Sequence, residues 1–79
     1  MTRVRYFAGA AEAAGTESEQ VHASTLGDLR RLIVERHGVA LERVLGRCSL
    51  LINGARTEDA GAALADGDTV DVLPPFAGG

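Results

Sequence analysis

The stretch TLGDLRRLIVERHG, Thr25–Gly38, is the clearest structural signal in the sequence. Thr25 and Asp28 have the spacing of a capping box, in which the threonine hydroxyl accepts from the Asp28 N–H and the carboxylate reaches back. Apolar residues then recur on one helical face, with arginines opposite: Leu26, Leu29, Leu32 and Ile33. Gly38 is suited to end the helix in a left-handed conformation. We therefore expect one amphipathic helix with a buried face.

Alternating apolar and polar residues on both sides of this helix predict strands. TRVRYFA at 2–8 predicts the first strand, and EQVHAS at 19–24 predicts a second that forms a hairpin with it. CSLLIN at 48–53 ends in an Asn-Gly pair that favours a tight turn, and a minimal strand at 55–57 follows the turn. TVDVL at 69–73 predicts the last strand.

The remaining segments carry weaker signals. GAAEAAGTESE at 9–19 is bracketed by glycines and predicts a loop with one helical turn. LERVLG at 41–46 predicts a second, shorter helical turn, and AALADGD at 62–68 predicts a helical turn that leads into a polar turn.

The predicted order is β, β, α, β, short β, β, which indicates an α+β domain with one main helix packed on one face of a mixed sheet. The first and last strands are apolar on their inner faces, so we expect them to lie parallel at the centre of the sheet. This is the β-grasp, or ubiquitin-like, arrangement. We assign residues 1–73 to this domain and 74–79 to a flexible tail that ends in Gly-Gly.

Composition excludes several classes of function. A chain of 79 residues predicts one domain, and its net charge of −3 does not favour nucleic acid as a partner. No apolar run is long enough to span a membrane. The single cysteine, Cys48, excludes an internal disulfide framework and fits a reducing compartment, so we expect a cytoplasmic protein. All eight basic residues are arginine.

The composition of the segment PPFAGG at 74–79 predicts an extended, narrow C-terminal tail. Pro74 and Pro75 fix φ near −65° and hold the chain extended beyond the sheet. Gly78 and Gly79 lack Cβ atoms, so they can enter a narrow channel and present the terminal carboxylate as a chemical handle. A terminal Gly-Gly alone is most often a frayed end. The Pro-Pro spacer after a complete β-grasp pattern favours a tail that presents its carboxylate to a partner over a frayed end.

The whole chain resembles the MoaD/ThiS sulfur carriers, prokaryotic relatives of ubiquitin. The matching stretches are YFAGAAEAAG, TLGDLRRLI, LINGA and LADGDTVDVLPPFAGG. The YFA start favours the MoaD branch, the small subunit of molybdopterin synthase. MoaD proteins often carry Arg-Glu where this chain has Ala11-Glu12, so any contact made by that arginine is missing here.

The resemblance implies a carrier subunit with no catalytic chemistry of its own and no bound cofactor or metal. A MoeB-like adenylyltransferase would use ATP to convert the Gly79 carboxylate to an acyl-adenylate. A sulfur donor such as a cysteine desulfurase or rhodanese-type protein would then leave a C-terminal thiocarboxylate. A MoaE-like large subunit, in a heterotetramer, would pass that sulfur to cyclic pyranopterin monophosphate in molybdenum cofactor biosynthesis.

We expect partner proteins to contact two groups of residues. The first is an outward-facing apolar patch on neighbouring strands, formed by Phe7, Leu51 and Leu73 if Leu50 and Ile52 point inward. The second is the tail, where Pro75, Phe76 and Ala77 would be bound and Gly78 and Gly79 would carry the chemistry.

Other residue types give weaker candidates. Cys48 has no base beside it in sequence and favours a buried, inert thiol. His22 and His37 are isolated and do not make a metal site. Three alternative functions stay open: a ThiS-like or cysteine-synthesis sulfur carrier, a ubiquitin-like tag joined to target lysines, and a plain interaction module with an idle tail.

Overall fold

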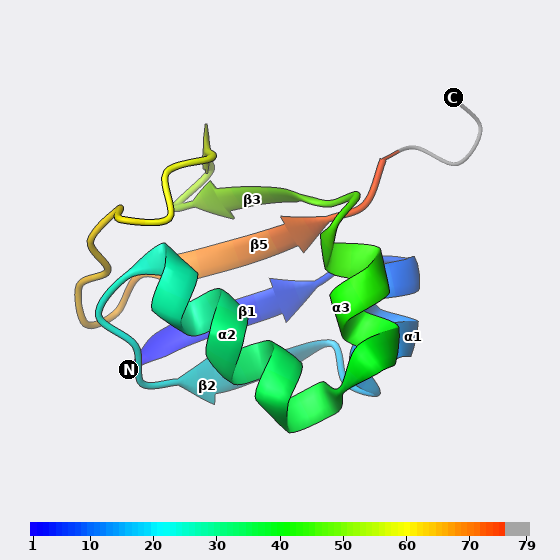
Figure 1. Ribbon diagram of the computed structural model, residues 1–79. Helices are drawn as coiled ribbons and strands as arrows, with labels where there is room; N and C mark the ends of the chain where they lie inside the picture. The colour runs from blue at the N-terminus through cyan, green and yellow to red at the C-terminus, as the bar shows by residue number, and fades with distance from the viewer. Residues whose placement is uncertain (76–79) are drawn as a thin grey trace.

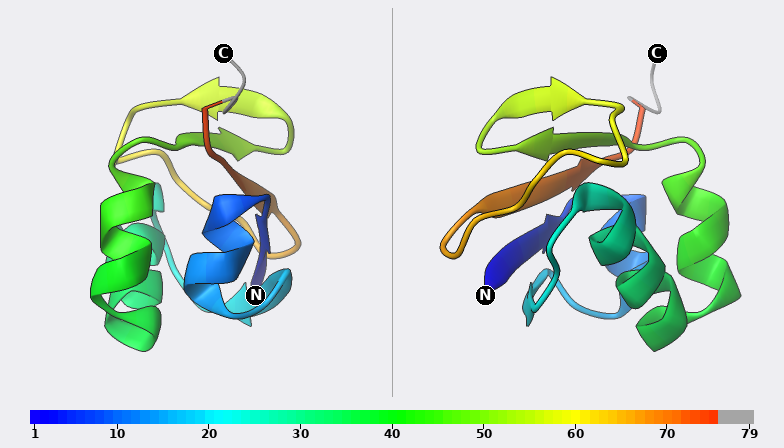
Figure 2. Two further views of the ribbon diagram at one scale, coloured as in Figure 1. Left: turned by 90° about the vertical axis from the view of Figure 1, so that its right-hand side faces the viewer. Right: turned by 60° about the vertical axis from the view of Figure 1, so that its left-hand side comes forward.

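The computed structural model describes residues 1–75, which form a five-stranded mixed sheet with three helices. Figures 1 and 2 show the helices on one side of the sheet, with no described helix on the opposite face. The strands and helices are β1 Thr2–Tyr6, α1 Gly9–Ala14, β2 Ser18–Val21, α2 Leu26–His37, α3 Val39–Leu45, β3 Ser49–Ile52, β4 Ala55–Thr57 and β5 Thr69–Leu73. No helix within this range is long and apolar enough to cross a membrane.

The strand order is β2-β1-β5-β3-β4, which confirms the predicted β-grasp arrangement. β1 and β5 run parallel at the centre, with Val4 opposite Val70 and Tyr6 opposite Val72. β2 pairs with the outer edge of β1, and β3 pairs with the other edge of β5, both antiparallel. The two ends of the domain therefore form the middle of the sheet.

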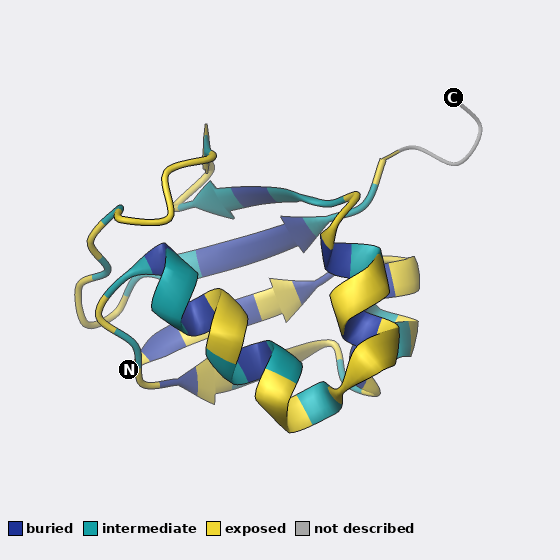
Figure 3. Ribbon diagram, in the orientation of Figure 1, coloured by how far each residue is buried: buried dark blue, intermediate teal, exposed yellow. Residues whose placement is uncertain are grey.

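The core lies between the sheet and helices α2 and α3. Val4, Val70 and Val72 cover the inner face of the two central strands and are fully buried. Helix residues pack against them: Leu26, Leu29, Ile33, Leu41 and Leu45. Figure 3 shows β5 buried along most of its length, as expected for a central strand. Leu32, expected on the buried face, is only partly buried at the edge of this core.

The start of α2 has the threonine half of the predicted capping box. Thr25 Oγ1 accepts from the Asp28 N–H at 3.1 Å, while the Asp28 carboxylate accepts from Arg31 at 2.7 Å. The end of α2 differs from the prediction. Gly38 has a positive φ of 85°, but its ψ of −162° is extended rather than left-handed helical. This conformation is open almost only to glycine, and it turns the chain directly into α3.

Two weaker predictions need correction. The segment after β1, predicted as a loop with one helical turn, is a six-residue helix, α1, because Ala10 and Ala14 are buried and make it part of the core. The segment at 62–68 contains no helical turn. Its backbone lies against the first turn of α2, where Ala62 accepts from the Leu26 N–H at 3.0 Å. The first N–H groups of a helix have no intrahelical partners, and here backbone carbonyls of the segment before β5 accept from them.

The tight turn at Asn53-Gly54 is confirmed and does more than reverse the chain. Both residues have positive φ, 49° and 85°, as a two-residue hairpin turn requires. The Asn53 side chain accepts from the Thr69 N–H and donates to the Asp68 carboxylate, each at 2.9 Å. The β3–β4 hairpin therefore fixes the start of β5.

A polar cluster joins the end of α2 to the sheet edge. Glu19 on β2 accepts from the Tyr6 hydroxyl at 2.5 Å and from Arg36 at 2.7 Å, and His37 Nε2 lies 2.5 Å from the same carboxylate. Burial opposes ionisation of Glu19, but these three hydrogen bonds outweigh it, and the pKa of Glu19 lies below its ordinary value. The ionised carboxylate therefore stabilises the folded state.

This cluster predicts a loss of stability in acid. Because the folded pKa of Glu19 is lowered from 4.5, its contribution is complete above that value and is lost as pH falls through the folded pKa. We expect Glu19→Gln to lower the free energy of unfolding by about 1–2 kcal/mol at neutral pH. It should also weaken the dependence of stability on pH below 4.5. Urea titrations across pH would measure both effects.

Glu42→Gln is the matched control, since Glu42 is exposed on α3 and makes no ion pair within the described residues. Equal losses of stability in the two variants would show that the Glu19 cluster contributes nothing of its own.

Candidate functional site

The root of the tail lies at the end of the central strand. β5 ends at Leu73, Pro74 is half-buried and Pro75 is exposed. The Phe7 N–H donates to the Val72 carbonyl at 3.2 Å, so the end of β1 accompanies the chain to this point. Figure 1 shows β1 and β5 ending at the same side of the sheet. Phe76, Ala77, Gly78 and Gly79 lie outside the described residues.

The open face of the sheet is the side away from the helices. Phe7 lies there beside the tail root, with 38% of its surface exposed. Leu51 and Leu73 are half-buried, and Leu50 is buried on the opposite, inner face as expected. Ser49 pairs with Leu73, while Leu51 pairs with Asp71. The three apolar residues therefore share this face, but a charged residue lies among them.

That charged residue forms an ion pair in the middle of the open face. Arg5 Nε donates to Asp71 Oδ1 at 2.6 Å, and Nη2 donates to Oδ2 at 2.9 Å. The hydrogen bonds to Asp71 raise the pKa of Arg5. The Arg5 guanidinium also lies 5.6 Å from the centre of the Phe7 ring, within range of a cation–π contact. Asp71 is buried, whereas about half of the Arg5 side chain is exposed.

This ion pair was not predicted, although the sequence contains a signal for it. Arg5 and Asp71 both occupy outward positions of the two strands predicted to be neighbours at the centre of the sheet. Opposite charges at directly paired positions are expected to interact.

A groove continues from this face toward α1. Arg3, Arg5, Phe7, Ala11 and Glu17 are among its lining residues. Ala11 is the position at which the MoaD branch often carries arginine. Here its methyl group is half-buried against the core, so position 11 adds no charge to the groove.

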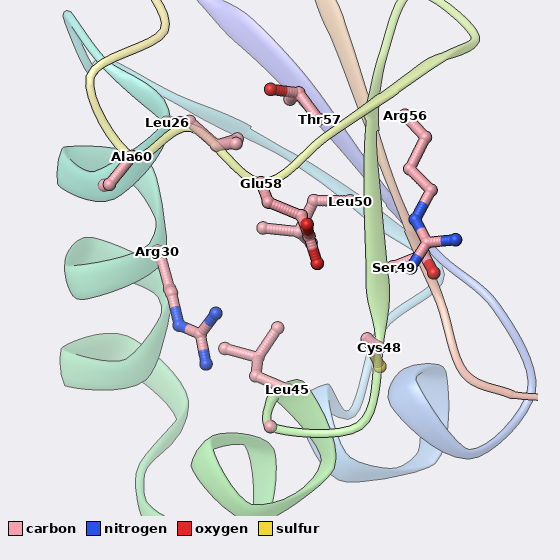
Figure 4. A pocket seen from close by; sticks show the side chains of 12 residues that line it. Leu26, Arg30, Leu45, Cys48, Ser49, Leu50, Arg56, Thr57, Glu58 and Ala60 are labelled. Atoms are coloured by element: carbon pink, nitrogen blue, oxygen red, sulfur yellow. The ribbon is translucent and has the colours of Figure 1, made fainter.

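A separate cavity of about 240 Å³ lies on the helical side, between α2 and the β3–β4 hairpin. Figure 4 shows Arg30 extending from α2 and Cys48 at the start of β3 among its lining residues. The Cys48 thiol donates to the Val44 carbonyl at 3.2 Å, and burial raises its pKa. No group of three metal-binding side chains occurs within the described residues.

The geometry described so far is that of a small domain that presents its C-terminal segment beside an open sheet face. A comparison with protein families matches the ThiS family over residues 4–79, nearly the whole chain. The chain belongs to the ThiS family. Its fold is the ubiquitin-like β-grasp fold of the ThiS and MoaD sulfur carriers. A comparison with curated proteins found no match.

Solved structures of similar chains include both archaeal and bacterial proteins. Small archaeal modifier protein 1 (SAMP1) from Haloferax volcanii is 34% identical, covers 99% of this ThiS-family chain and 98% of its own, and has a TM-score of 0.86. Subunit 1 in a complex with subunit 2 of molybdopterin-converting factor from Helicobacter pylori is 29% identical, with coverages of 99% and 97% and a TM-score of 0.77. CysO from Mycobacterium tuberculosis, at 20% identity, coverages of 94% and 98% and a TM-score of 0.79, shares the fold.

Cys48 provides a test of the electrostatics near the tail root. Because its pKa is raised, little thiolate forms near neutral pH, and only the thiolate attacks disulfides. We expect the folded protein to react with an aromatic disulfide reagent about tenfold more slowly than the urea-unfolded chain at about pH 8. Absorbance of the released thiol gives both rates, and equal rates would contradict the assignment of Cys48 as a protected thiol.

Proposed function

We propose that this chain is a sulfur carrier whose C-terminal Gly79 carboxylate is adenylated, converted to a thiocarboxylate and used as a sulfur donor. The family match that continues through residue 79 carries this proposal. The fold also supports the carrier function, because the central strand β5 leads directly into the Pro-Pro segment. The rigid sheet would hold the start of the arm while its last residues enter a partner's active site.

The chemistry requires activation first. A carboxylate is a poor acyl donor at neutral pH, so an adenylating enzyme would join it to AMP and release pyrophosphate. A donor persulfide would then attack the same carbon and release AMP, and a thiol would reduce the resulting acyl disulfide, leaving a thiocarboxylate on Gly79. Tethering the sulfur to a folded domain makes its delivery a positioned, effectively unimolecular step. The carrier would supply binding and position, and ATP would be consumed by the activating enzyme.

We further propose that the acceptor is a MoaE-like large subunit of molybdopterin synthase, which would pass the sulfur to cyclic pyranopterin monophosphate. Support comes from the 29% identity to subunit 1 of the Helicobacter pylori factor, a protein solved in complex with its second subunit. A putative subunit 1 from Pyrococcus furiosus, 26% identical with a TM-score of 0.79, adds to it. The compartment we propose for this reaction is the cytoplasm.

A second candidate is a protein tag. The Haloferax volcanii relative at 34% identity is by name a modifier protein. A tag would use the same adenylate but pass Gly79 to an amine rather than pass on sulfur. Because this chain has no lysine, it cannot form lysine-linked polymers of itself. Single attachment to another protein would distinguish this function from sulfur transfer.

Intact-protein mass spectrometry tests the carrier function. With ATP, the host's adenylating enzyme and a sulfur source, the chain should gain the mass difference between sulfur and oxygen. Deleting Gly79, or adding one alanine after it, should abolish this gain and leave the melting temperature unchanged, since neither change alters the core. An alanine-extended chain that still gains the mass would rule out Gly79 as the point of attachment.

Association with the large subunit tests the open face. Phe7→Arg should weaken binding by about 2 kcal/mol or more, because buried aromatic residues are common anchors of interfaces. Calorimetry would measure the affinity, and circular dichroism would verify the fold. Val39→Arg is the matched control, since Val39 is also exposed but lies on α3, on the helical side. Equal effects of the two substitutions would remove the open face from the interface.

A further inference from the structure

The cavity on the helical side of the sheet has an apolar floor. Three buried leucines from different elements form this floor: Leu26 of α2, Leu45 of α3 and Leu50 of β3. The cavity volume of about 240 Å³ lies below the roughly 300–1,000 Å³ of pockets that hold drug-sized ligands. A molecule that fits it is therefore a small metabolite with an apolar part.

Two opposite charges face each other across this cavity. Figure 4 shows the Arg30 side chain entering from α2 and the Glu58 side chain entering from the segment that follows β4. Neither side chain forms an ion pair within residues 1–75. Arg56 also lines the cavity, but it lies opposite Leu51 in the β3–β4 pair and so belongs to the outward side of the hairpin. Arg30 and Glu58 are therefore the charges available to a molecule inside.

The wall that carries Glu58 is fixed to α2 by backbone contacts. The Gly27 N–H donates to the Ala60 carbonyl at 2.8 Å. A Cβ at position 27 would lie 3.1 Å from that carbonyl oxygen, so the two segments approach about as closely as a glycine allows. The Asp59 N–H also donates to Thr57 Oγ1 at 3.2 Å. A wall that is already ordered in this way loses little conformational entropy when a ligand binds.

We propose that this cavity binds a free α-amino acid with a branched apolar side chain, such as leucine. Its carboxylate would accept from the Arg30 guanidinium, its ammonium would donate to the Glu58 carboxylate, and its side chain would lie on the apolar floor. A ligand with only one charge would desolvate the other charged side chain without giving it a partner, which is unfavourable. A zwitterion satisfies both side chains through charge-assisted hydrogen bonds, which are the stronger kind. The proposal goes beyond the carrier function and does not depend on it.

Titration of the isotope-labelled protein with L-leucine, followed by the NMR chemical shifts of its backbone amides, tests this proposal. Leucine should cause saturable shifts at Gly27, Leu50 and Ala60, with a Kd of about 1 mM, as expected for so small a ligand. An absence of saturable shifts at about 20 mM leucine would overturn the proposal.

Two analogues of leucine test the charges of the ligand. Leucinamide keeps the ammonium, and N-acetylleucine keeps the carboxylate. Each should bind about tenfold more weakly than leucine, because one charged contact is lost. The analogues also represent the two ends of a peptide, so either of them binding as tightly as leucine would favour a peptide terminus and contradict a site for the free amino acid.

Variants test the charges of the protein. Arg30→Gln and Glu58→Gln should each raise the Kd for leucine about tenfold. Arg43→Gln and Glu42→Gln are the matched controls, because these residues lie on α3 and do not line the cavity, and they should leave Kd within about twofold. All four residues are exposed, so each variant should fold, and its amide spectrum away from the cavity verifies this. A Kd that is the same in Arg30→Gln, Glu58→Gln and the natural chain would show that the cavity is not an amino-acid site.

Discussion

The register between β1 and β5 is the constraint on which both sides of the sheet depend. Placing Val4 opposite Val70 buries one pair of side chains under the helices. The same register places Arg5 opposite Asp71 on the other face. Because side chains alternate along a strand, a slip of one residue would turn the core outward and the ion pair inward. The buried core and the Arg5–Asp71 ion pair are therefore set by one alignment of two short segments at opposite ends of the domain.

Tyr6 and Phe7 are consecutive residues, but their side chains lie on opposite sides of the sheet. Tyr6 points inward and donates to Glu19 in the cluster that ties α2 to the sheet. Phe7, the next residue, lies on the open face beside the tail root and under the Arg5 guanidinium. Under the proposed function, substitutions of exposed outward residues such as Phe7 affect partner binding and leave the helical side unchanged. Substitutions on the inward positions change stability first.

Much of the fold could be predicted from the sequence because its signals are local. The α2 cap and apolar spacing lie within one segment, and the Asn53-Gly54 turn needs only two residues. The polar turn predicted within 62–68 is present, but the helical turn predicted before it was wrong, because the Ala62 carbonyl accepts from the first turn of α2, a contact that no local pattern reports. Only one helical turn was predicted for the segment that forms α1, because alanines give a weak apolar signal, although Ala10 is fully buried.

The apolar residues of the candidate site could be predicted from the sequence, whereas the ion pair among them could not. Alternation along the strands placed Phe7, Leu51 and Leu73 on one face. The Arg5–Asp71 pair required the register between strands as well as their order. The Glu19 cluster brings together residues of β1, β2 and the end of α2. The contact between Glu19 and His37 could therefore be predicted only once the relative positions of these three segments were known.

The strand order also has a consequence for how the chain reaches its native state. The β1–β2 and β3–β4 pairs are each close in sequence and can form early, but only β5 joins them. Until β5 is in place, the inner edges of β1 and β3 present unpaired backbone groups, which are templates for aggregation. A chain interrupted before residue 69 lacks the strand that covers both edges. During synthesis the inner edges of β1 and β3 therefore stay unpaired until β5 has been made.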